Sequence, residues 1–359
     1  RDNWELAFST SVDDNNIRIN SGSGVTLFEV SSDISDWDEV ISIPSDAVQL
    51  RNSNVVWEEG AFLVNASGEL NYGWGNYNPD TQIIEGSKIY IINYGGQSKK
   101  IRINSLDNGV FNFTFSNLDG SSELTTSVNT LDYLNKKFIY YSLTNLEIVN
   151  REPDSNDWDI VFTKYETDLN AENSQGELFY IVTGALSNSN LVYQYDGFLD
   201  VNPENSSIVN NAVYTISSIG WDWKEFGGGG YTIVPNRAYF ILNQNENKIY
   251  KIFFESFSGG SSGNCSFFIE QTPYDSTSFP EITNNIINIY PNPSQGIFYV
   301  NSNEHQLECT ILDTNGKIIL NQILLNNEPI DLRNMPQGLY FINLASENAI
   351  INKKISIYR

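Results

Sequence analysis

The chain is poor in histidine, methionine and cysteine. Its 359 residues include 1 His, 1 Met and 2 Cys. His305, Cys309 and Met335 lie in the last fifth of the chain, which leaves Cys265 alone among residues 1–286. The shortage argues against a zinc site, against histidine-based general-base catalysis and against a framework of disulfide bonds. We therefore expect a protein that is not an enzyme.

Basic residues and long apolar runs are also scarce. The chain has 20 Lys/Arg against 44 Asp/Glu, a net charge of −24, and residues 287–359 carry only −1 of it. An acidic body repels phosphate backbones, so nucleic acid is excluded as a partner, and solvated acidic surfaces of an exported protein are expected. No apolar run is long enough to span a bilayer. A strand-like "WELAF" follows Arg1 almost at once, so we expect a removed signal peptide or another segment before it.

Alternation of apolar and polar residues is the main pattern in the chain. It runs through "NWELAF" (3–8), "GVFNFTFSN" (109–117), "DWDIVFTKYET" (157–167) and "NKIYKIFFESF" (247–257). Side chains of a strand point alternately to its two faces, so this pattern predicts half-buried strands. A Gly-Gly turn is expected between the strands of "KIYIINYGGQSKKIRI" (88–103). No segment keeps a 3.6-residue period with helix caps, and the predicted class is all-β.

The chain is expected to form two domains. A stretch rich in proline and hydroxyl residues, 272–286, lacks apolar periodicity and is predicted to be a linker. It separates a large β domain at 1–271 from a tail at 287–359. The tail has short strands at regular spacing, which predicts a small β-sandwich.

Two hexapeptides of the body resemble each other. "WELAFS" (4–9) and "WDIVFT" (158–163) share a tryptophan, an acid, an aliphatic residue, a phenylalanine and a hydroxyl. This is thin support for a duplication. We expect two strands with the same task, each with aromatic residues toward the core and its acid toward water.

Each of the other candidate sites in the body also has an explanation that involves no ligand or catalysis. "EFGGGGY" (225–231) lacks the Lys-Ser/Thr of a phosphate-binding loop, and a flexible loop is expected. "SVDDNN" (11–16) offers oxygen ligands for Ca²⁺ without EF-hand spacing, and surface acids are the alternative. Carboxylates between 157 and 168 favour solvated surface acids over a catalytic pair, with Asp159 facing water. They are Asp157, Asp159, Glu166 and Asp168.

Aromatic residues gather in the polar stretch "YGWGNYN" (72–78). Tyr72, Trp74 and Tyr77 stand among glycines and asparagines. Such rings stack on sugars or flat ligands, or cover the edge of a core, and both alternatives stay open from the sequence.

The tail resembles a known family of export signals. "YPNPSQGIFYV" (290–300), "ILDTNGKII" (311–319), "DLRNMPQGLYFINL" (331–344) and "KKISIYR" (353–359) are similar to the type A C-terminal sorting domain of the Bacteroidetes type IX secretion system. Its motif residues here are Pro291, Asn292, Pro293, Gly296, Gly316, Lys317, Gly338, Lys353, Lys354 and Arg359.

This resemblance implies an Ig-like sandwich and an export route. The implied partners are the type IX translocon and its outer-membrane shuttle protein, a sorting peptidase and surface lipopolysaccharide. The implied location is extracellular or on the cell surface, after passage through the periplasm. His305 and Cys309 of this tail would share a strand face with Leu307, which favours a core position over a metal site.

The body resembles a second family. "NWELAFSTSVDDNNIRINSGSGV" (3–25), "REPDSNDWDIVFTKYET" (151–167), "IGWDWKEF" (219–226) and shorter blocks in the same order are similar to the HmuY-like haem-binding surface proteins. The resemblance implies a mostly antiparallel β fold and haem as the inherited ligand. Haem iron in that family is held by pairs of histidines or methionines, and residues 1–271 contain neither.

The departure from the family sets the expected function. Cys265 is expected to be a small residue at a strand start rather than a haem thiolate, and no tyrosine is singled out. We expect a secreted or surface-anchored, non-enzymatic HmuY-like protein without bis-His or bis-Met ligation. The alternatives are a haem- or porphyrin-binding protein with atypical ligation, and a surface adhesin or structural protein.

Overall fold

The computed structural model describes residues 3–11, 14–67, 70–169, 178–188, 190–200, 202–243, 248–272, 288–290, 292, 294–301, 306–313, 317–325, 328–345 and 350–357. Its paired strands are antiparallel, which confirms the all-β class. Within these ranges, no helix is long and apolar enough to cross a lipid bilayer. The chain divides into two compact units, Arg1–Tyr274 and Asp275–Arg359. Apart from Thr272, the predicted linker lies outside the described residues.

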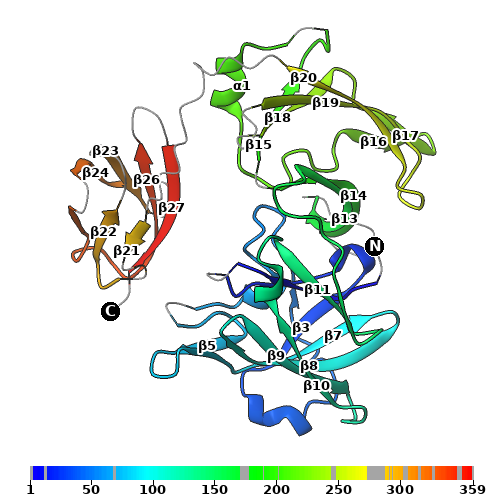
Figure 1. Ribbon diagram of the computed structural model, residues 1–359, viewed down its shortest axis with the longest axis vertical. Coiled ribbons are helices and arrows are strands. Elements are labelled where there is room, and N and C mark those ends of the chain that lie inside the picture. The colour runs from blue at the N-terminus through cyan, green and yellow to red at the C-terminus, as the bar shows by residue number, and fades with distance from the viewer. Residues whose placement is uncertain are drawn as a thin grey trace. The chain divides into compact units, whose positions relative to one another are not determined.

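The first half of the body contains two sheets around an aromatic core (Figure 1). One sheet has the order β12-β11-β1-β2, and the other has the order β10-β9-β8-β7-β3-β4 with β5 and β6 attached. Phe8 packs on Phe111, and Phe111 packs on Trp74, all within this core. The strands are β1 (Leu6–Ser9), β2 (Ile17–Ile19), β3 (Thr26–Ser31), β4 (Gln49–Leu50), β5 (Gly75–Asn78), β6 (Ile83–Gly86), β7 (Ile89–Tyr94), β8 (Gln97–Asp107), β9 (Val110–Asn117), β10 (Leu124–Asn129), β11 (Phe138–Ser142) and β12 (Glu147–Val149). The 3-10 helices are η1 (Ser21–Ser23), η2 (Ile34–Asp38), η3 (Ala61–Leu63) and η4 (Thr130–Tyr133).

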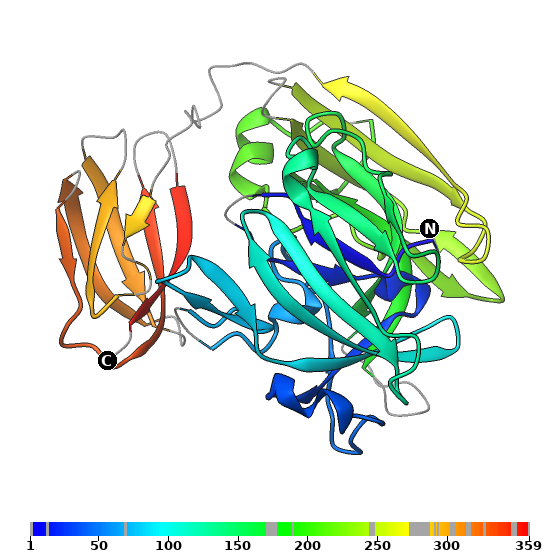
Figure 2. The same cartoon turned by 60° about the horizontal axis from the view of Figure 1, so that its bottom comes forward.

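The second half of the body has its own core. A β13–β14 hairpin lies beside a sheet of order β15-β18-β19-β20, and a β16–β17 hairpin projects from the body (Figure 2). Trp223 stacks on Phe254 with ring centroids 3.7 Å apart and forms the centre of this core. The elements are β13 (Ile160–Asp168), β14 (Phe179–Ser187), β15 (Leu191–Asp196), α1 (Asn205–Asn211), β16 (Lys224–Gly227), β17 (Gly230–Ile233), β18 (Arg237–Asn243), β19 (Lys248–Phe257) and β20 (Cys265–Thr272).

Pairs of glycines make two of the hairpin turns. Gly95 and Gly96, with φ of +55° and +76°, join β7 to β8 and confirm the predicted Gly-Gly turn. Gly228 and Gly229, with φ of +59° and +86°, join β16 to β17. Two successive residues with positive φ match the tight two-residue turns of hairpins. The expectation of a flexible loop in "EFGGGGY" is therefore wrong, because Gly227 and Gly230 belong to the two strands and Gly228 and Gly229 form the turn between them.

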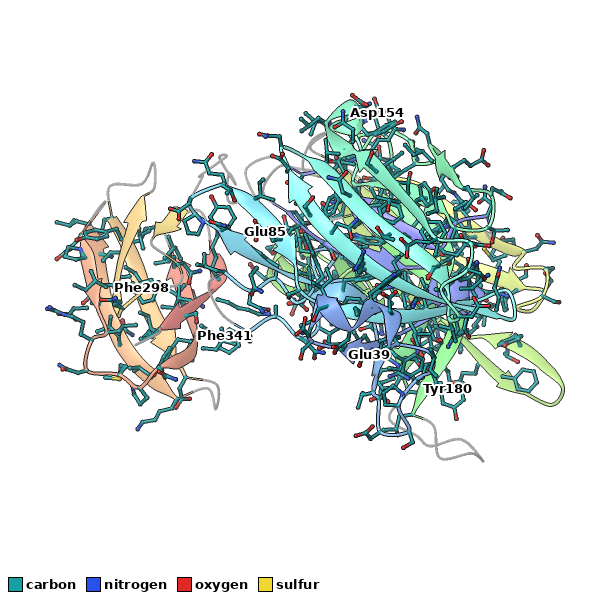
Figure 3. The ribbon with its side chains drawn as sticks, turned by 90° about the horizontal axis from the view of Figure 1, so that it is seen from below. Glu39, Glu85, Asp154, Tyr180, Phe298 and Phe341 are labelled. Carbon is teal, nitrogen blue, oxygen red and sulfur yellow. The ribbon has the colours of Figure 1, made fainter. Side chains whose placement is uncertain are left out.

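The tail is a β-sandwich of a three-stranded and a four-stranded sheet. The sheet orders are β21-β22-β25 and β24-β23-β26-β27. Phe298 is fully buried in the core of this unit, whereas Phe341 is exposed (Figure 3). The strands are β21 (Asn288–Tyr290), β22 (Ile297–Asn301), β23 (Gln306–Leu312), β24 (Ile318–Leu325), β25 (Pro329–Asp331), β26 (Gly338–Ala345) and β27 (Ile350–Ile357).

Most acidic side chains face solvent, but the acid of the first hexapeptide does not. Glu39, Glu85 and Asp154 are exposed (Figure 3). Glu5 is buried, and its carboxylate accepts hydrogen bonds from Leu143 N (2.6 Å) and Thr144 Oγ1 (2.8 Å). The expectation that the acid of "WELAFS" faces water is wrong. The carboxylate is needed to satisfy backbone and hydroxyl donors that would otherwise be buried without an acceptor.

A close backbone approach joins the two halves of the body. An added Cβ at Gly22, in η1, would lie 2.0 Å from the carbonyl oxygen of Lys164 in β13. Only glycine allows this contact without moving one of the two segments. The contact fixes the separation of η1 and β13 at one point.

We expect Gly22→Ala to destabilise the body by about 2 kcal/mol, because the added methyl group overlaps a backbone carbonyl. Gly227→Ala is the matched control, since a Cβ there meets nothing within 4 Å. Urea unfolding followed by tryptophan fluorescence measures the body alone, because all 7 tryptophans precede residue 224. Equal midpoints for both variants and the unchanged protein would contradict the prediction.

Candidate functional site

A cavity of about 700 Å³ lies where β1, β2 and β11 meet the β13–β14 hairpin. We call it the aromatic cleft, because seven aromatic side chains contribute to its lining. They are Trp4, Trp57, Phe138, Tyr140, Trp158, Phe162 and Tyr165. The cavity lies within the size range of sites for small organic ligands.

Edge-to-face contacts fix the rings of this cleft. Trp57 lies 6.3 Å from Trp158 between centroids, with an interplanar angle of 81°, and 5.9 Å from Phe138. Trp4 packs on Tyr140 at 4.7 Å. Such contacts orient aromatic rings, and they stabilise the fold by more than the burial of apolar area alone provides. The walls of the cleft are therefore shaped before any ligand is bound.

One hydrogen-bond donor of the cleft has no partner. The indole Nε1 of Trp57 donates to the carbonyl of Ser187 at 2.9 Å. The Nε1 of Trp158 is buried and finds no acceptor among the described residues. A buried donor without an acceptor is costly and uncommon in native structures. Trp158 Nε1 is therefore a candidate contact for an acceptor group of a ligand.

The guanidinium of Arg18 lies under the cleft. It donates to the carbonyls of Ser53 (2.5 Å) and Trp57 (2.9 Å), and further to those of Val56 and Glu59. Its Cζ lies 5.2 Å from the ring centroid of Trp57. Burial lowers the pKa of Arg18 to about 10, so the side chain stays protonated at neutral pH. Arg18 thereby ties the strandless segment 51–59 to β2 and places Trp57 in the cleft.

A phenol and a carboxyl group, those of Tyr140 and Glu152, also line the cleft. The hydroxyl of Tyr140 donates to Glu152 Oε2 at 2.7 Å, and the backbone N–H of Lys137 donates to Glu152 Oε1 at 2.9 Å. Burial raises the pKa of Tyr140, and the neighbouring Glu152 raises it further. Burial also raises the pKa of Glu152. Formation of a tyrosinate at Tyr140 is thus strongly disfavoured.

The lining of the cleft carries an excess of positive charge. Its ionisable groups include four cations, Arg18, Lys137, Arg151 and Lys164, and one carboxylate, Glu152. The chain as a whole has a net charge of −24. A local reversal of sign at a concave site favours ligands that carry negative charge.

Two of the carboxylates between 157 and 168 are held in structural contacts. Asp159 is half-buried and accepts from Asn190 Nδ2 (2.6 Å) and Asn243 Nδ2 (2.9 Å). The expectation that Asp159 faces water is wrong, because it precedes the strand and is taken up by these amides. Glu166 forms an ion pair with Arg51 at 3.1 Å. Asp157 and Asp168 are exposed.

The aromatic residues of "YGWGNYN" belong to the core. Trp74 is fully buried and donates from Nε1 to the carbonyl of Asn15 at 3.1 Å. Tyr72 and Tyr77 are partly buried against the same core. The alternative of a core edge is confirmed for this motif.

The "SVDDNN" segment is described only in part, since Val12 and Asp13 lie outside the described residues. Burial raises the pKa of Asp14 to about 6, and its Oδ1 accepts from Asn16 N at 3.0 Å. In the described part of the chain, no three His, Cys, Asp or Glu side chains are grouped so that they could hold a metal ion.

The two cysteines occupy strands. Cys265 begins β20 and is partly buried against the second core of the body, as expected for a residue at a strand start. Leu307 and Cys309 are buried in the tail core, and burial raises the pKa of the Cys309 thiol to about 11. This confirms the predicted core face for these two residues, while His305 lies outside the described residues.

The "PNPSQG" motif connects the two sheets of the tail. The side-chain amide of Asn292 donates to the carbonyl of Lys354 (2.9 Å), and its Oδ1 accepts from Ser356 N (3.0 Å). The side chain of Asn292 thus makes the two hydrogen bonds to β27 that the backbone of a neighbouring strand would make. Ser294 N donates to the carbonyl of Ser356 at 2.9 Å and continues the pairing. Gly296 has φ of +100°, and an added Cβ would lie 2.9 Å from Arg333 Cα, so only glycine fits this position without strain.

The basic motif residues of the tail are exposed. Lys353 and Lys354 lie on β27, an edge strand of the four-stranded sheet, and Lys317 precedes the opposite edge strand, β24. Gly338 begins β26 with φ of +152°. Four motif residues, Pro291, Pro293, Gly316 and Arg359, lie outside the described residues.

The sequence contained one signal of the aromatic cleft. Trp4 and Trp158 are the first residues of the two similar hexapeptides, and both line the cleft. The sequence offered no comparable indication that Trp57, Tyr140 and Glu152 line the cleft. Trp57 lies about 80 residues from Tyr140 in the sequence, and the fold alone brings them together.

Comparison with known families identifies the tail. Residues 288–358 match the model of a secretion system C-terminal sorting domain. This match implies export of the protein by type IX secretion to the cell surface or the extracellular space. It also implies an interaction with the type IX secretion machinery. A search of curated proteins finds no significant match to the chain.

We expect Asn292→Ala to open the edge of β27 locally, since Ser356 N loses its acceptor and about 1 kcal/mol of stabilisation is lost. Hydrogen-exchange mass spectrometry should show faster exchange in residues 350–357. Asn334→Ala is the matched control, because its exposed side chain has no partner among the described residues. Unchanged protection of β27 in Asn292→Ala would show that the amide does not hold the edge.

Proposed function

We propose that the protein is a non-enzymatic, HmuY-like binding protein of the cell surface or the extracellular space. Its body takes up a flat organic ligand with acidic groups in the aromatic cleft. Its tail directs the protein through the type IX translocon and is then available to a sorting peptidase and to attachment at surface lipopolysaccharide.

The aromatic cleft is the observation that carries this proposal. It combines a volume of about 700 Å³ with three tryptophans whose orientations are fixed by neighbouring rings. A rigid aromatic wall offers a large apolar contact area at a low cost in conformational entropy. Trp158 Nε1 adds a donor that lacks an acceptor among the described residues.

The charge of the lining supports an acidic ligand. Lys137, Arg151 and Lys164 surround the cleft together with Arg18. Arg18 is already bonded to four carbonyls, so its contribution is the field of a buried positive charge. Burial lowers the pKa of Lys137, and an anionic ligand would raise it again.

The chemistry of the cleft argues against iron ligation. Residues 1–271 contain neither His nor Met. Tyr140 and Tyr165 both line the cleft. The hydroxyl of Tyr140 is bonded to Glu152, and burial raises the pKa of both phenols, so both are poor sources of tyrosinate. A porphyrin, the inherited candidate of the HmuY-like resemblance, would therefore be held by its ring and its carboxylates.

Haemin and metal-free protoporphyrin IX should bind to the full chain with similar affinity, because the iron would make no bond to the protein. The haemin complex should lack the sharp Soret band of a low-spin, six-coordinate iron. Titrations followed by absorbance and tryptophan quenching measure both. A sharp low-spin spectrum with stoichiometric uptake of haemin alone would overturn this reading of the cleft.

A substitution in the aromatic cleft tests whether the porphyrin binds there. Trp158→Phe keeps an aromatic ring and removes the N–H, and we expect affinity for protoporphyrin IX to fall about fivefold. Trp221→Phe, in a different cavity of the body, is the matched control. Equal affinities in both variants and the unchanged protein would place the ligand elsewhere.

The edge of β27 is the proposed contact of the tail with the export machinery. Lys353 and Lys354 place two exposed charges on β27, which pairs with β26 on one side and receives the contacts of Asn292 and Ser294 on the other. Charged residues on an edge strand also prevent unspecific pairing with other strands. Recognition of this edge would combine the two charges with the geometry that Asn292 imposes.

Deletion of residues 287–359 should leave the body in the periplasm, as measured by cell fractionation. The double variant Lys353→Glu/Lys354→Glu should reduce surface delivery, whereas Asn321→Glu, at an exposed position of the opposite edge strand β24, should not. Normal surface delivery of the truncated chain would refute the sorting role. Normal delivery of the double variant would refute only the role of the β27 edge.

A further inference from the structure

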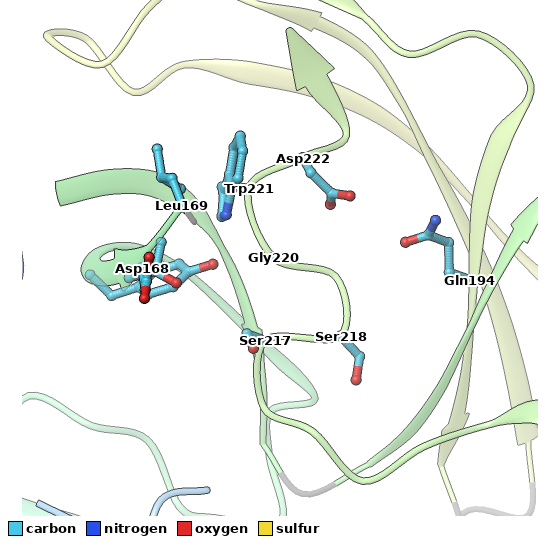
Figure 4. A pocket seen from close by; sticks show the side chains of 10 residues that line it. Asp168, Leu169, Gln194, Ser217, Ser218, Gly220, Trp221 and Asp222 are labelled. Atoms are coloured by element: carbon cyan, nitrogen blue, oxygen red, sulfur yellow. The ribbon is translucent and has the colours of Figure 1, made fainter. Parts of the chain in front are cut away.

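A second, polar cavity of the body shares one lining residue, Tyr165, with the aromatic cleft. It has a volume of about 320 Å³ and lies between the end of β13, strand β15 and the loop 217–222 (Figure 4). Its polar lining includes Tyr165, Asp168, Gln194, Ser217, Ser218 and Asp222, with Trp221 beside them. We call it the polar pocket.

Tyr165 contributes an unused hydroxyl to this pocket. Its side chain is only 7% exposed, and its Oη has no hydrogen-bond partner among the described residues. An added Cβ at Gly220 would lie 3.6 Å from this Oη and 3.8 Å from Asp222 Oδ1. Both Gly220 and Asp222 line the polar pocket and not the aromatic cleft, which places the hydroxyl on the side of the polar pocket.

The ring of Trp221 is available for stacking. It is half-exposed and has neither an aromatic nor a cationic partner within the described part of the chain. Its indole stands beside Asp222 and across from Gln194 in the pocket (Figure 4). The adjacent Trp223, in contrast, is buried and stacked on Phe254.

The loop that carries Trp221 is held on both sides. Gly220 exchanges two backbone hydrogen bonds with Ala185 of β14, at 2.9 and 3.0 Å. Lys224 Nζ donates to the carbonyl of Trp221 at 3.0 Å, and Trp223 Nε1 donates to that of Gly220 at 3.1 Å. These contacts fix the backbone of the loop, so the pocket is preformed.

The ionisable side chains among the ten lining residues are acidic or phenolic. Asp168 and Asp222 contribute carboxylates, and none of the ten described lining residues is a lysine or an arginine. Arg237 forms an ion pair with Asp222 at 2.9 Å without lining the pocket. The pocket therefore disfavours anions, and its carboxylates offer acceptors to a ligand that donates hydrogen bonds.

We propose that the polar pocket binds a neutral saccharide unit. One face of a sugar ring is apolar and suits the free ring of Trp221, while its hydroxyls donate to Asp168, Asp222 and Gln194. A sugar oxygen accepts the hydrogen bond from Tyr165 Oη that no described residue of the protein accepts. Tyr165 lines both this pocket and the aromatic cleft, and the occupant proposed here differs in charge from the ligand proposed for the cleft.

The test uses four free neutral sugars, glucose, galactose, mannose and N-acetylglucosamine, with glucuronate as the anionic comparison. Saturation-transfer NMR and calorimetry on the full chain should show binding of at least one neutral sugar. Glucuronate should bind more weakly than glucose. Failure of all four neutral sugars to bind, or tighter binding of glucuronate than of glucose, would overturn the proposal.

Two variants locate the site. Trp221→Ala should lower the affinity for the bound sugar about tenfold, and Tyr165→Phe about fivefold. Tyr165→Phe should fold with unchanged or higher thermal stability, because it removes a buried hydroxyl without a partner. Trp158→Phe, in the aromatic cleft, is the control and should bind the sugar normally. Normal binding by Trp221→Ala and Tyr165→Phe would place the sugar elsewhere and refute the pocket, whatever the aromatic cleft binds.

Discussion

The buried guanidinium of Arg18 is the contact on which the aromatic cleft depends. A charge removed from water is destabilising unless hydrogen bonds satisfy its donors, and four backbone carbonyls do so here. All four belong to segment 53–59, which has no strand partner of its own. The same segment carries Trp57, so one ionic group holds both a loop and a wall of the binding site.

The tail uses a neutral amide for a related purpose. Asn292 supplies one donor and one acceptor to the edge of β27 and so replaces a strand residue between two prolines, which have no N–H to donate. This gives the motif "PNP" a structural reason besides recognition. The amide leaves the edge regular while both lysines of β27 remain exposed.

The sequence predicted elements well where the local pattern decides the structure. Alternation predicted strands such as β7, β8 and β9, and paired glycines predicted the β7–β8 turn. Local pattern does not reveal which buried donors need an acceptor. Glu5 and Asp159 were therefore expected at the surface, although the donors they satisfy lie more than 130 and about 30 to 80 residues away.

The candidate sites were hidden from the sequence for the same reason. Tyr165 is an ordinary strand residue by pattern, and its unused hydroxyl becomes visible only when Gly220 and Asp222 are placed beside it. Trp221 and Trp223 are two residues apart and equivalent by alternation, yet one is stacked in the core and the other is free at a pocket. Such differences arise from the path of the whole chain.

The two cavities of the acidic body differ in the charge of the side chains that line them. The aromatic cleft gathers four of the cations of a chain that has only 20, and the polar pocket keeps the prevailing negative sign. A long-range negative field slows the approach of any anion, but within a Debye length of about 8 Å the local cations dominate. The cleft can therefore favour an acidic ligand at contact in a protein that repels anions at a distance. Affinity in the cleft should then depend on the separation of these charges from the ligand more than on the net charge of the chain.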